Sequence, residues 1–114
     1  MSTAPVVIWL DDNRKPDQMR LEWLLDPTPV ESCEVVWVKT YHDFIDAVKA
    51  HADRLVLLCL DFYLGGGADG YDATKWFVEN YPHLNSVVRG RSQSISPQGR
   101  RKIHDLLTQH NFQI

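Results

Sequence analysis

The chain contains two short apolar segments, and each of them ends in aspartate. Residues 6–10 read Val-Val-Ile-Trp-Leu and lead directly into Asp11 and Asp12. Residues 55–60 read Leu-Val-Leu-Leu-Cys-Leu and lead into Asp61. Apolar runs of this length without polar alternation are typical of parallel strands that are covered on both faces. Because ligands bind at the carboxyl ends of such strands, the pattern predicts an acidic pocket at that edge of the sheet.

Strand patterns and helix patterns alternate along the whole chain. Strands are expected at residues 6–10, 34–39, 55–60 and 86–89, with a short edge strand at 112–114. Helices are expected to begin near Pro16, Thr40, Tyr71 and Pro97, with prolines at the first helical position in the first and last of them. This alternation predicts an α/β fold with a doubly wound parallel sheet of four to five strands. We expect one domain over residues 1–114 that stops after the fourth helix.

Composition narrows the function classes. The 114 residues carry a formal net charge of −3, which gives no general basic surface for nucleic acid. No apolar run approaches the roughly 18 residues that a membrane span needs, and the start of the chain does not resemble a signal peptide. We therefore expect a cytoplasmic protein that does not bind membranes. Cys59 is expected to be a small buried apolar residue, and the four tryptophans are expected to pack in the core. An exposed Trp23 or Trp37 would instead indicate a partner surface.

The three strand-end aspartates are candidate metal ligands. Mg²⁺ prefers oxygen ligands and usually takes one or two carboxylates together with water and substrate phosphate. Asp11, Asp12 and Asp61 satisfy that preference, and Arg14 could hold a phosphate oxygen. The alternative is that these aspartates only cap helices or form turns. The sequence leaves both readings open and slightly favours Mg²⁺.

A second feature is the stretch from Arg89 to Lys102, which holds five of the 12 basic residues. Ser94 and Ser96 precede Pro97, where the start of a helix would favour an anion. A phosphate, or less readily an RNA backbone, could bind here. The alternative is that Ser96 caps the helix and the basic side chains are solvated. The glycine run at residues 65–67 is more readily a flexible connection than a phosphate loop, because it lacks the Gly-Lys-Ser/Thr ending.

Several fragments together resemble a known family. Residues 10–16 read Leu-Asp-Asp-Asn-Arg-Lys-Pro, residues 60–65 read Leu-Asp-Phe-Tyr-Leu-Gly, and residues 69–71 read Asp-Gly-Tyr. Residues 93–99 read Gln-Ser-Ile-Ser-Pro-Gln-Gly, and residues 37–44 also match. The pattern resembles the receiver domain of two-component signalling, and more closely its shorter relative, the cyclic-phosphate processing receiver domain. The resemblance implies a receiver-like, flavodoxin-like fold with Mg²⁺ as cofactor. The candidate phosphate or ligand site comprises the following residues, of which Ser94 and Gly99 match family positions: Arg14, Gln93, Ser94, Ser96, Gly99 and Arg100.

The departures from the family bear on catalysis. Phe62 and Tyr63 replace a histidine and an aspartate of the family, and Gln93 and Ser96 replace a histidine and an asparagine. Histidine titrates near neutral pH and can transfer protons, whereas Phe62 and Gln93 cannot. The resemblance therefore implies that the metal ligands are kept and the proton-transfer groups are lost.

Three hypotheses follow. The favoured one is a divergent, degenerate member that is not an enzyme. It would bind a protein partner or a phosphorylated small molecule or nucleotide, and its small size would suit a phage or mobile-element protein. The second is a Mg²⁺-dependent phosphoesterase that acts on cyclic phosphates or nucleotides, with Asp61 as a catalytic residue. The third is a receiver that is phosphorylated on Asp61, and it is the least favoured because no strand followed by lysine comes after the fourth helix.

Overall fold

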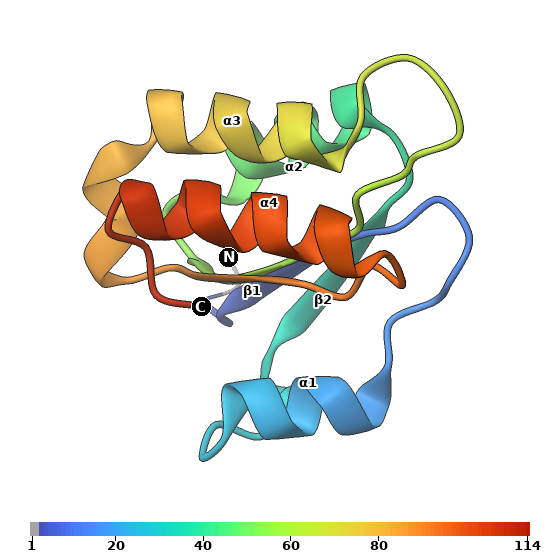
Figure 1. Ribbon diagram of the computed structural model, residues 1–114. Coiled ribbons are helices and arrows are strands. Elements are labelled where there is room, and N and C mark those ends of the chain that lie inside the picture. The colour runs from blue at the N-terminus through green and yellow to red at the C-terminus, as the bar shows by residue number, and fades with distance from the viewer. Residues whose placement is uncertain (1–2) are drawn as a thin grey trace.

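The computed structural model describes residues 3–114 and contains one parallel sheet with helices on both faces (Figure 1). The strands are β1 (Val6–Leu10), β2 (Glu34–Val38), β3 (Leu55–Leu60) and β4 (Arg89–Ser92). They lie in the order β2-β1-β3-β4, and every neighbouring pair is parallel. The predicted doubly wound α/β sheet is therefore confirmed, with four strands in the described part of the chain.

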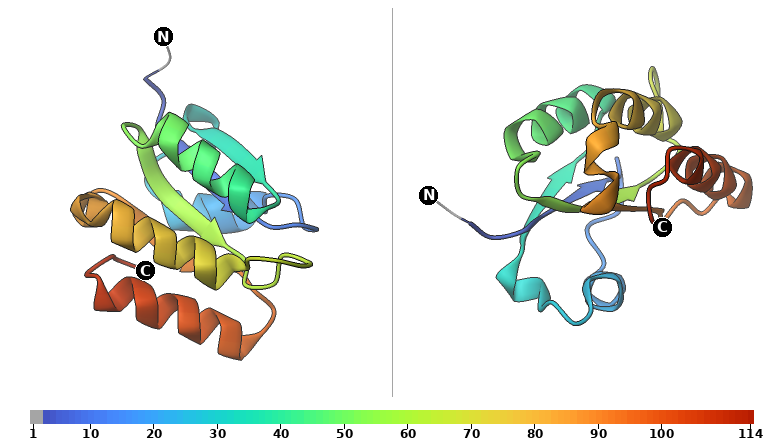
Figure 2. Two further views of the ribbon diagram at one scale, coloured as in Figure 1. Left: turned by 90° about the horizontal axis from the view of Figure 1, so that it is seen from above. Right: turned by 90° about the vertical axis from the view of Figure 1, so that its left-hand side faces the viewer.

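Four helices cover the two faces of this sheet. They are α1 (Gln18–Leu25), α2 (Tyr41–His51), α3 (Gly70–Asn80) and α4 (Pro97–Gln109). The first helix lies alone on one face, and the other three cover the opposite face (Figures 1 and 2). Two short 3-10 helices, Val30–Ser32 and Pro82–Ser86, complete the connections. The apolar core accordingly has two parts, one on each side of the sheet.

The helix starts are set by side chains that accept hydrogen bonds from the first turn. Thr40 and Ser96 cap α2 and α4 as expected, and Pro97 takes the first helical position. At α3, Asp69 and Asp72 form a reciprocal capping box. The prediction for the first helix was wrong by two residues. Asp17 rather than Ser or Thr accepts the Arg20 N–H, so α1 begins at Gln18 and Pro16 precedes the cap.

The fourth strand was predicted at residues 86–89 and lies instead at Arg89–Ser92. Its sequence, Arg-Gly-Arg-Ser, has no apolar side chain that would reveal a strand. Gly90 faces α4 so closely that a Cβ atom there would lie 2.8 Å from Leu107 Cδ1. On the other face, Arg89 donates a hydrogen bond to the Leu24 carbonyl at the end of α1. This edge strand is therefore held by its neighbours rather than by its own hydrophobicity.

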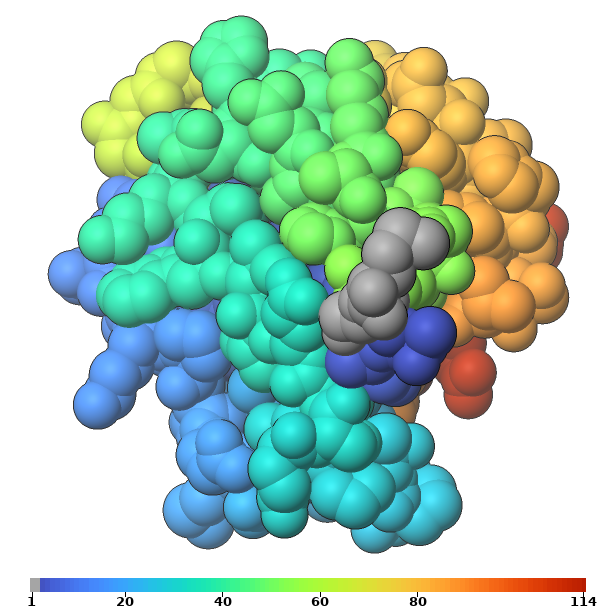
Figure 3. All heavy atoms as spheres, turned by 180° about the vertical axis from the view of Figure 1, so that it is seen from behind, coloured from blue at the N-terminus to red at the C-terminus, as the bar shows by residue number. Residues whose placement is uncertain are grey.

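Both edges of the sheet can be followed in the structure. The segment that contains β2 forms part of the surface seen from behind (Figure 3). At the other edge, the predicted strand at 112–114 is reduced to one bridge between Arg89 and Gln113. The Gly90 N–H donates to the Gln113 carbonyl, 2.9 Å away. The last residues thus cover only the beginning of β4.

The tryptophans follow the core prediction only in part. Trp9 is fully buried and Trp76 is half-buried, but Trp23 is 64% exposed and Trp37 is 39% exposed. The ring of Trp23 lies under the guanidinium group of Arg91, 5.1 Å from the ring centroid. The core prediction was therefore wrong for Trp23 and Trp37, which are both exposed. Cys59 is buried as expected, and burial raises the pKa of its thiol to about 12.

Within residues 3–114, none of the helices has the length and apolar character that crossing a membrane would require.

Candidate functional site

The three predicted aspartates come together at the carboxyl ends of two neighbouring strands. Asp11 and Asp12 follow β1, and Asp61 follows β3, which pairs with β1. One carboxylate oxygen from each residue lies within 4.8 Å of the others. This group is called the acidic centre below. In the strand order β2-β1-β3-β4, chain connections leave β1 and β3 in opposite directions, which is where open α/β sheets bind ligands.

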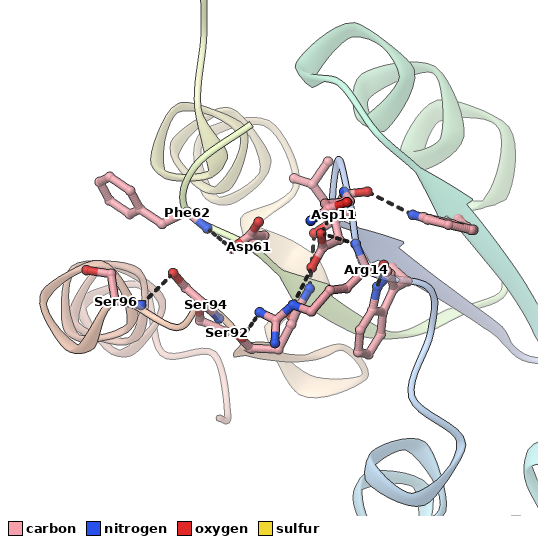
Figure 4. Close-up of polar contacts among 12 residues, drawn as sticks. Asp11, Arg14, Asp61, Phe62, Ser92, Ser94 and Ser96 are labelled. Atoms are coloured by element: carbon pink, nitrogen blue, oxygen red, sulfur yellow. Dashed lines mark hydrogen bonds and ion pairs between the residues drawn. The ribbon is translucent and has the colours of Figure 1, made fainter. Parts of the chain in front are cut away.

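Asp11 is almost completely buried, with 1% of its surface exposed. Its Oδ1 atom accepts hydrogen bonds from the N–H groups of Asn13 (3.0 Å) and Arg14 (2.8 Å) (Figure 4). Its Oδ2 atom has no hydrogen-bond partner among the described residues. The nearest cation is Arg14 Nε, 3.7 Å from Oδ2, in a loose ion pair. One oxygen therefore shapes the loop, and the other is left without a donor.

Two tryptophans hold the loop that carries these residues. The Trp37 indole N–H donates to the Asp11 carbonyl at 2.8 Å, and the Trp9 indole N–H donates to the Arg14 carbonyl at 3.0 Å. Trp9 belongs to β1 and Trp37 to its neighbour β2, so the sheet itself fixes the loop. A change at the acidic centre should therefore be visible in tryptophan fluorescence.

Asp61 is only 9% exposed and lies against the start of α3. Its Oδ1 atom accepts the Phe62 N–H at 2.9 Å. Burial, followed by the neighbouring charge of Asp11, raises the pKa of the Asp61 carboxyl above its ordinary value. A Cβ atom at Gly70 would lie 1.6 Å from the Asp61 carbonyl oxygen, so this close approach requires glycine. The centre is thus a crowded group of like charges.

Asp12 is the exposed member of the acidic centre. The glycine loop passes beside it. Gly65 has a φ of 86°, and a Cβ atom at this position would lie 3.1 Å from Asp12 Oδ2. Glycine is favoured at this left-handed conformation. The glycine run thus connects β3 to α3, as the sequence favoured.

Gln93 adds a second buried oxygen without a donor. The side chain is 4% exposed, and its amide nitrogen donates to the Leu10 carbonyl at 3.1 Å. Its Oε1 atom has no partner among the described residues, like Asp11 Oδ2. Buried polar atoms are seldom left unpaired. Three carboxylates plus a nearby unpaired acceptor fit a hydrated cation such as Mg²⁺, whose bound water can donate to such an oxygen.

The predicted phosphate-site residues divide into two groups. Arg14, Gln93, Ser94 and Arg100 border one polar cavity beside the acidic centre. Ser96 and Gly99 do not border it. The Ser96 hydroxyl oxygen accepts the Gly99 N–H and so caps α4. Their predicted ligand role therefore stays a prediction, and their observed contacts are structural.

Gly99 is covered by the residue that replaces a family histidine. A Cβ atom at Gly99 would lie 2.8 Å from the Cβ and Cγ atoms of Phe62, so the aromatic ring packs on the start of α4. Phe62 also contacts the Tyr63 ring edge-on, with the centroids 4.9 Å apart. This position is filled by packing and offers no group that can transfer a proton.

The sequence did not single out five further residues that border the same polar cavity: Arg20, Arg91, Ser92, Ile95 and His104. Arg20 comes from α1, Arg91 from β4, and His104 from α4. The signal that could have found Arg91 is the alternation in residues 89–92, had that segment been taken as a strand. Arg20 and His104 are brought to the cavity only by the packing of their helices, which no local pattern reveals.

Comparison with protein families gives a match over residues 6–109 to the cyclic-phosphate processing receiver domain. The chain belongs to that family. The resemblance seen in the sequence fragments is therefore confirmed over nearly the whole chain. A comparison with curated proteins found no match.

Solved structures of receiver domains share the fold. The phosphorylated cyanobacterial phytochrome response regulator RcpA is 23% identical, with a TM-score of 0.58, and the match covers 90% of this chain and 75% of that one. A chain of the CheX-CheY-BeF3-Mg²⁺ complex from Borrelia burgdorferi is 14% identical, with a TM-score of 0.59, and covers 90% and 72%. These likenesses confirm a receiver-like, flavodoxin-like fold.

Proposed function

We propose that this receiver-like domain binds Mg²⁺ at the acidic centre and, through it, a phosphate-bearing small molecule or nucleotide, without catalysing its hydrolysis. The observation that carries the proposal is the combination of two buried oxygens without donors and the loss of proton-transfer groups. Asp11 Oδ2 and Gln93 Oε1 have no hydrogen-bond partner among the described residues, and a cation or its bound water would supply one. Phe62, in contrast, is packed into the start of α4.

Each residue of the proposed site would have a distinct part in this binding. Asp11, Asp12 and Asp61 would hold the ion, and Gln93 would accept a hydrogen bond from its water. Mg²⁺, when bound, would neutralise the crowded carboxylates and attract a phosphate oxygen. Arg14 would add a cation on the side of the ligand, because its Nη2 atom is held by the Gln93 carbonyl at 2.8 Å. These contacts bind and orient a ligand.

Mg²⁺ titration followed by tryptophan fluorescence tests the metal site. We expect a saturable change at millimolar Mg²⁺, because Trp9 and Trp37 hydrogen-bond the loop of the acidic centre. Asp61→Asn should remove the change. Asp53→Asn is the matched control, because Asp53 is exposed in the turn that precedes β3. No response in the wild-type protein would overturn the metal site.

Assays with a nucleoside 2′,3′-cyclic phosphate test the absence of catalysis. We expect this probe to bind in the presence of Mg²⁺ and to remain intact on prolonged incubation. Hydrolysis that disappears in Asp61→Asn would overturn the non-catalytic proposal and support a phosphoesterase. Incubation with acetyl phosphate and Mg²⁺ should leave the mass of the protein unchanged, and a gain of one phosphoryl group would support a phosphorylated receiver instead.

A further inference from the structure

A basic cavity opens beside the acidic centre, at the edge of β4. It has a volume of about 270 Å³ and is bordered by α1, β4, α4 and two loops. We call it the basic pocket, and it is lined by Arg14, Arg20, Arg91, Ser92, Gln93, Ser94, Ile95, Arg100 and His104. No carboxylate belongs to this lining. Four arginines thus line one small cavity in a chain whose net charge is negative.

Three of the four arginines of the basic pocket have no carboxylate partner within residues 3–114. Arg14 has the loose ion pair with Asp11, and within residues 3–114 none of the other three forms a salt bridge. Arg100 donates a hydrogen bond of 2.6 Å to the Ser94 carbonyl. Arg91 lies over the ring of Trp23. Within residues 3–114, the charges of Arg20, Arg91 and Arg100 are therefore not balanced by a salt bridge.

His104 contributes a neutral ring to this lining. Its Nε2 atom accepts the Ser92 N–H at 3.0 Å, so that nitrogen carries no proton. Burial, with the charges of Arg91 and Arg100, lowers the pKa of the imidazole, while the weaker effect of Asp105 raises it. The neutral ring then carries its hydrogen on Nδ1. The imidazole thus keeps one N–H that can donate a hydrogen bond.

The serine hydroxyls of the lining are donors as well. Ser92 Oγ accepts the Ser94 N–H, and Ser94 Oγ accepts the Ser96 N–H, both at 3.2 Å. Because the backbone uses these oxygens as acceptors, each hydroxyl hydrogen remains to be donated elsewhere. The one unpaired side-chain acceptor of the lining is Gln93 Oε1, which is assigned above to metal-bound water. The rest of the pocket offers donors.

We propose that the basic pocket binds the phosphate group of a phosphorylated small molecule without any need for Mg²⁺. Guanidinium groups match phosphate oxygens in paired hydrogen bonds, and the serine hydroxyls and the imidazole N–H complete the donor set. The volume lies slightly below the roughly 300 Å³ at which small-molecule pockets usually begin. It therefore suits one phosphate group, with the remainder of the molecule outside. This inference goes beyond the proposed function, because it places an anion site away from the metal.

Isothermal titration calorimetry in metal-free buffer with a chelator tests the proposal. The probes are inorganic phosphate and adenosine 5′-monophosphate. We expect saturable binding of both with one site per chain, because the phosphate group itself is recognised. Tighter binding of the nucleotide would identify a phosphate ester as the ligand, and equal or tighter binding of inorganic phosphate would identify the free ion. Heat changes without saturation for both probes would overturn the proposal.

Variants locate the site on the molecule. Arg91→Gln and Arg20→Gln should each weaken phosphate binding about tenfold, since each removes charged hydrogen bonds to the anion. Arg101→Gln is the matched control on α4, because Arg101 is exposed and outside the pocket. It should bind like wild type. Equal losses in all three variants would show a general charge effect and overturn the pocket.

Two measurements distinguish an error in the metal site from an error in the anion site. Asp61→Asn should keep phosphate binding in the chelator buffer while it loses the fluorescence response to Mg²⁺. Amide spectra by NMR should show phosphate-induced shifts at Ser92, Ser94 and Arg100 in folded wild-type protein. Shifts confined to the surroundings of Asp61 would contradict the basic pocket, whereas a missing Mg²⁺ response would contradict only the proposed function.

Discussion

The acidic centre and the basic pocket lie next to each other and carry opposite charges. Negative side chains gather in the first, and positive side chains gather in the second. In the acidic centre, three carboxylates crowd together and buried oxygens lack donors. In the basic pocket, four guanidinium groups and further donors face a cavity without a carboxylate. Arg14 and Gln93 connect the two regions through the hydrogen bond from Arg14 Nη2 to the Gln93 carbonyl. We propose that the first region binds a cation and the second an anion.

The two regions can be disturbed separately, because different elements form them. The acidic centre depends on the loops after β1 and β3, whereas the basic pocket depends on how α1 and α4 pack at the edge of β4. A cation should stabilise the first and an anion the second, because each ligand binds only the folded state. The following variants are chosen to break one region while the other is left intact.

The largest effect is expected from Gly70→Ala, which disturbs the acidic centre. The new Cβ atom would lie 1.6 Å from the Asp61 carbonyl oxygen, so the β3–α3 connection must move. We expect a loss of about 1–3 kcal/mol in the free energy of unfolding, measured by urea denaturation, and loss of the Mg²⁺ response. Gly67→Asn is the control, since its φ of 69° suits asparagine and the space around it is open. Similar stability of the two variants would contradict the close approach.

A comparable loss is expected from His104→Leu, which disturbs the basic pocket. The buried Ser92 N–H would lose its acceptor, which costs about 1–3 kcal/mol. His104→Gln keeps an acceptor oxygen and should retain most of the stability. Because the pKa of His104 is lowered, its neutral form stabilises the fold above its ordinary pKa, and this contribution is lost as the pH falls through the lowered value. Urea denaturation at several pH values should show that loss in wild type and not in His104→Gln.

A smaller effect of the opposite sign is expected from Asp61→Asn without metal. The raised pKa of Asp61 means that its charged form weakens the fold, so stability is lost as the pH rises through that pKa. Removing the charge should raise the melting temperature at neutral pH by a few degrees, roughly what 1 kcal/mol gives for a small domain. The difference from wild type should vanish below about pH 4, where aspartate is protonated. A lower melting temperature at neutral pH would contradict the like-charge crowding.

The smallest change is expected from Trp37→Phe, which sharpens the link between the acidic centre and its reporter. The variant removes the hydrogen bond to the Asp11 carbonyl and keeps an aromatic ring on β2. We expect a loss of about 1 kcal/mol and a weaker fluorescence response to Mg²⁺. Calorimetric binding of phosphate without metal should not change. An unchanged fluorescence response would assign the signal to Trp9 alone.

The same contrast explains what could be predicted from the sequence. Asp11, Asp12 and Asp61 directly follow apolar strands, so the strand pattern alone brings them together. The helix start at Thr40 is a local signal and was predicted correctly, and Ser96 caps α4, which was the alternative to its ligand role. The strand at 89–92 was misplaced because its alternation is arginine and small residues rather than apolar and polar.

The basic pocket could be predicted only in part, for a physical reason. Arg14 lies in a motif that resembles the family and Arg100 lies in the basic stretch 89–102, and both border the cavity. Arg20 and His104 lie on helix faces whose orientation is set by tertiary packing. Gly99 looked like a ligand residue, yet its lack of a side chain makes room for the ring of Phe62. Only the structure distinguishes a glycine that meets a ligand from one that meets a ring.

A crystal structure with Mn²⁺ in place of Mg²⁺ and with phosphate tests the central claim most directly, because anomalous scattering locates Mn²⁺ independently. We expect Mn²⁺ to bind oxygens of Asp11, Asp12 and Asp61, with one of its water molecules at Gln93 Oε1. It also predicts a separate phosphate among the arginines of the basic pocket. Electron density that shows neither ion at saturating concentrations would contradict the claim that the two regions bind opposite ions separately. Phosphate found only on the metal would contradict it as well.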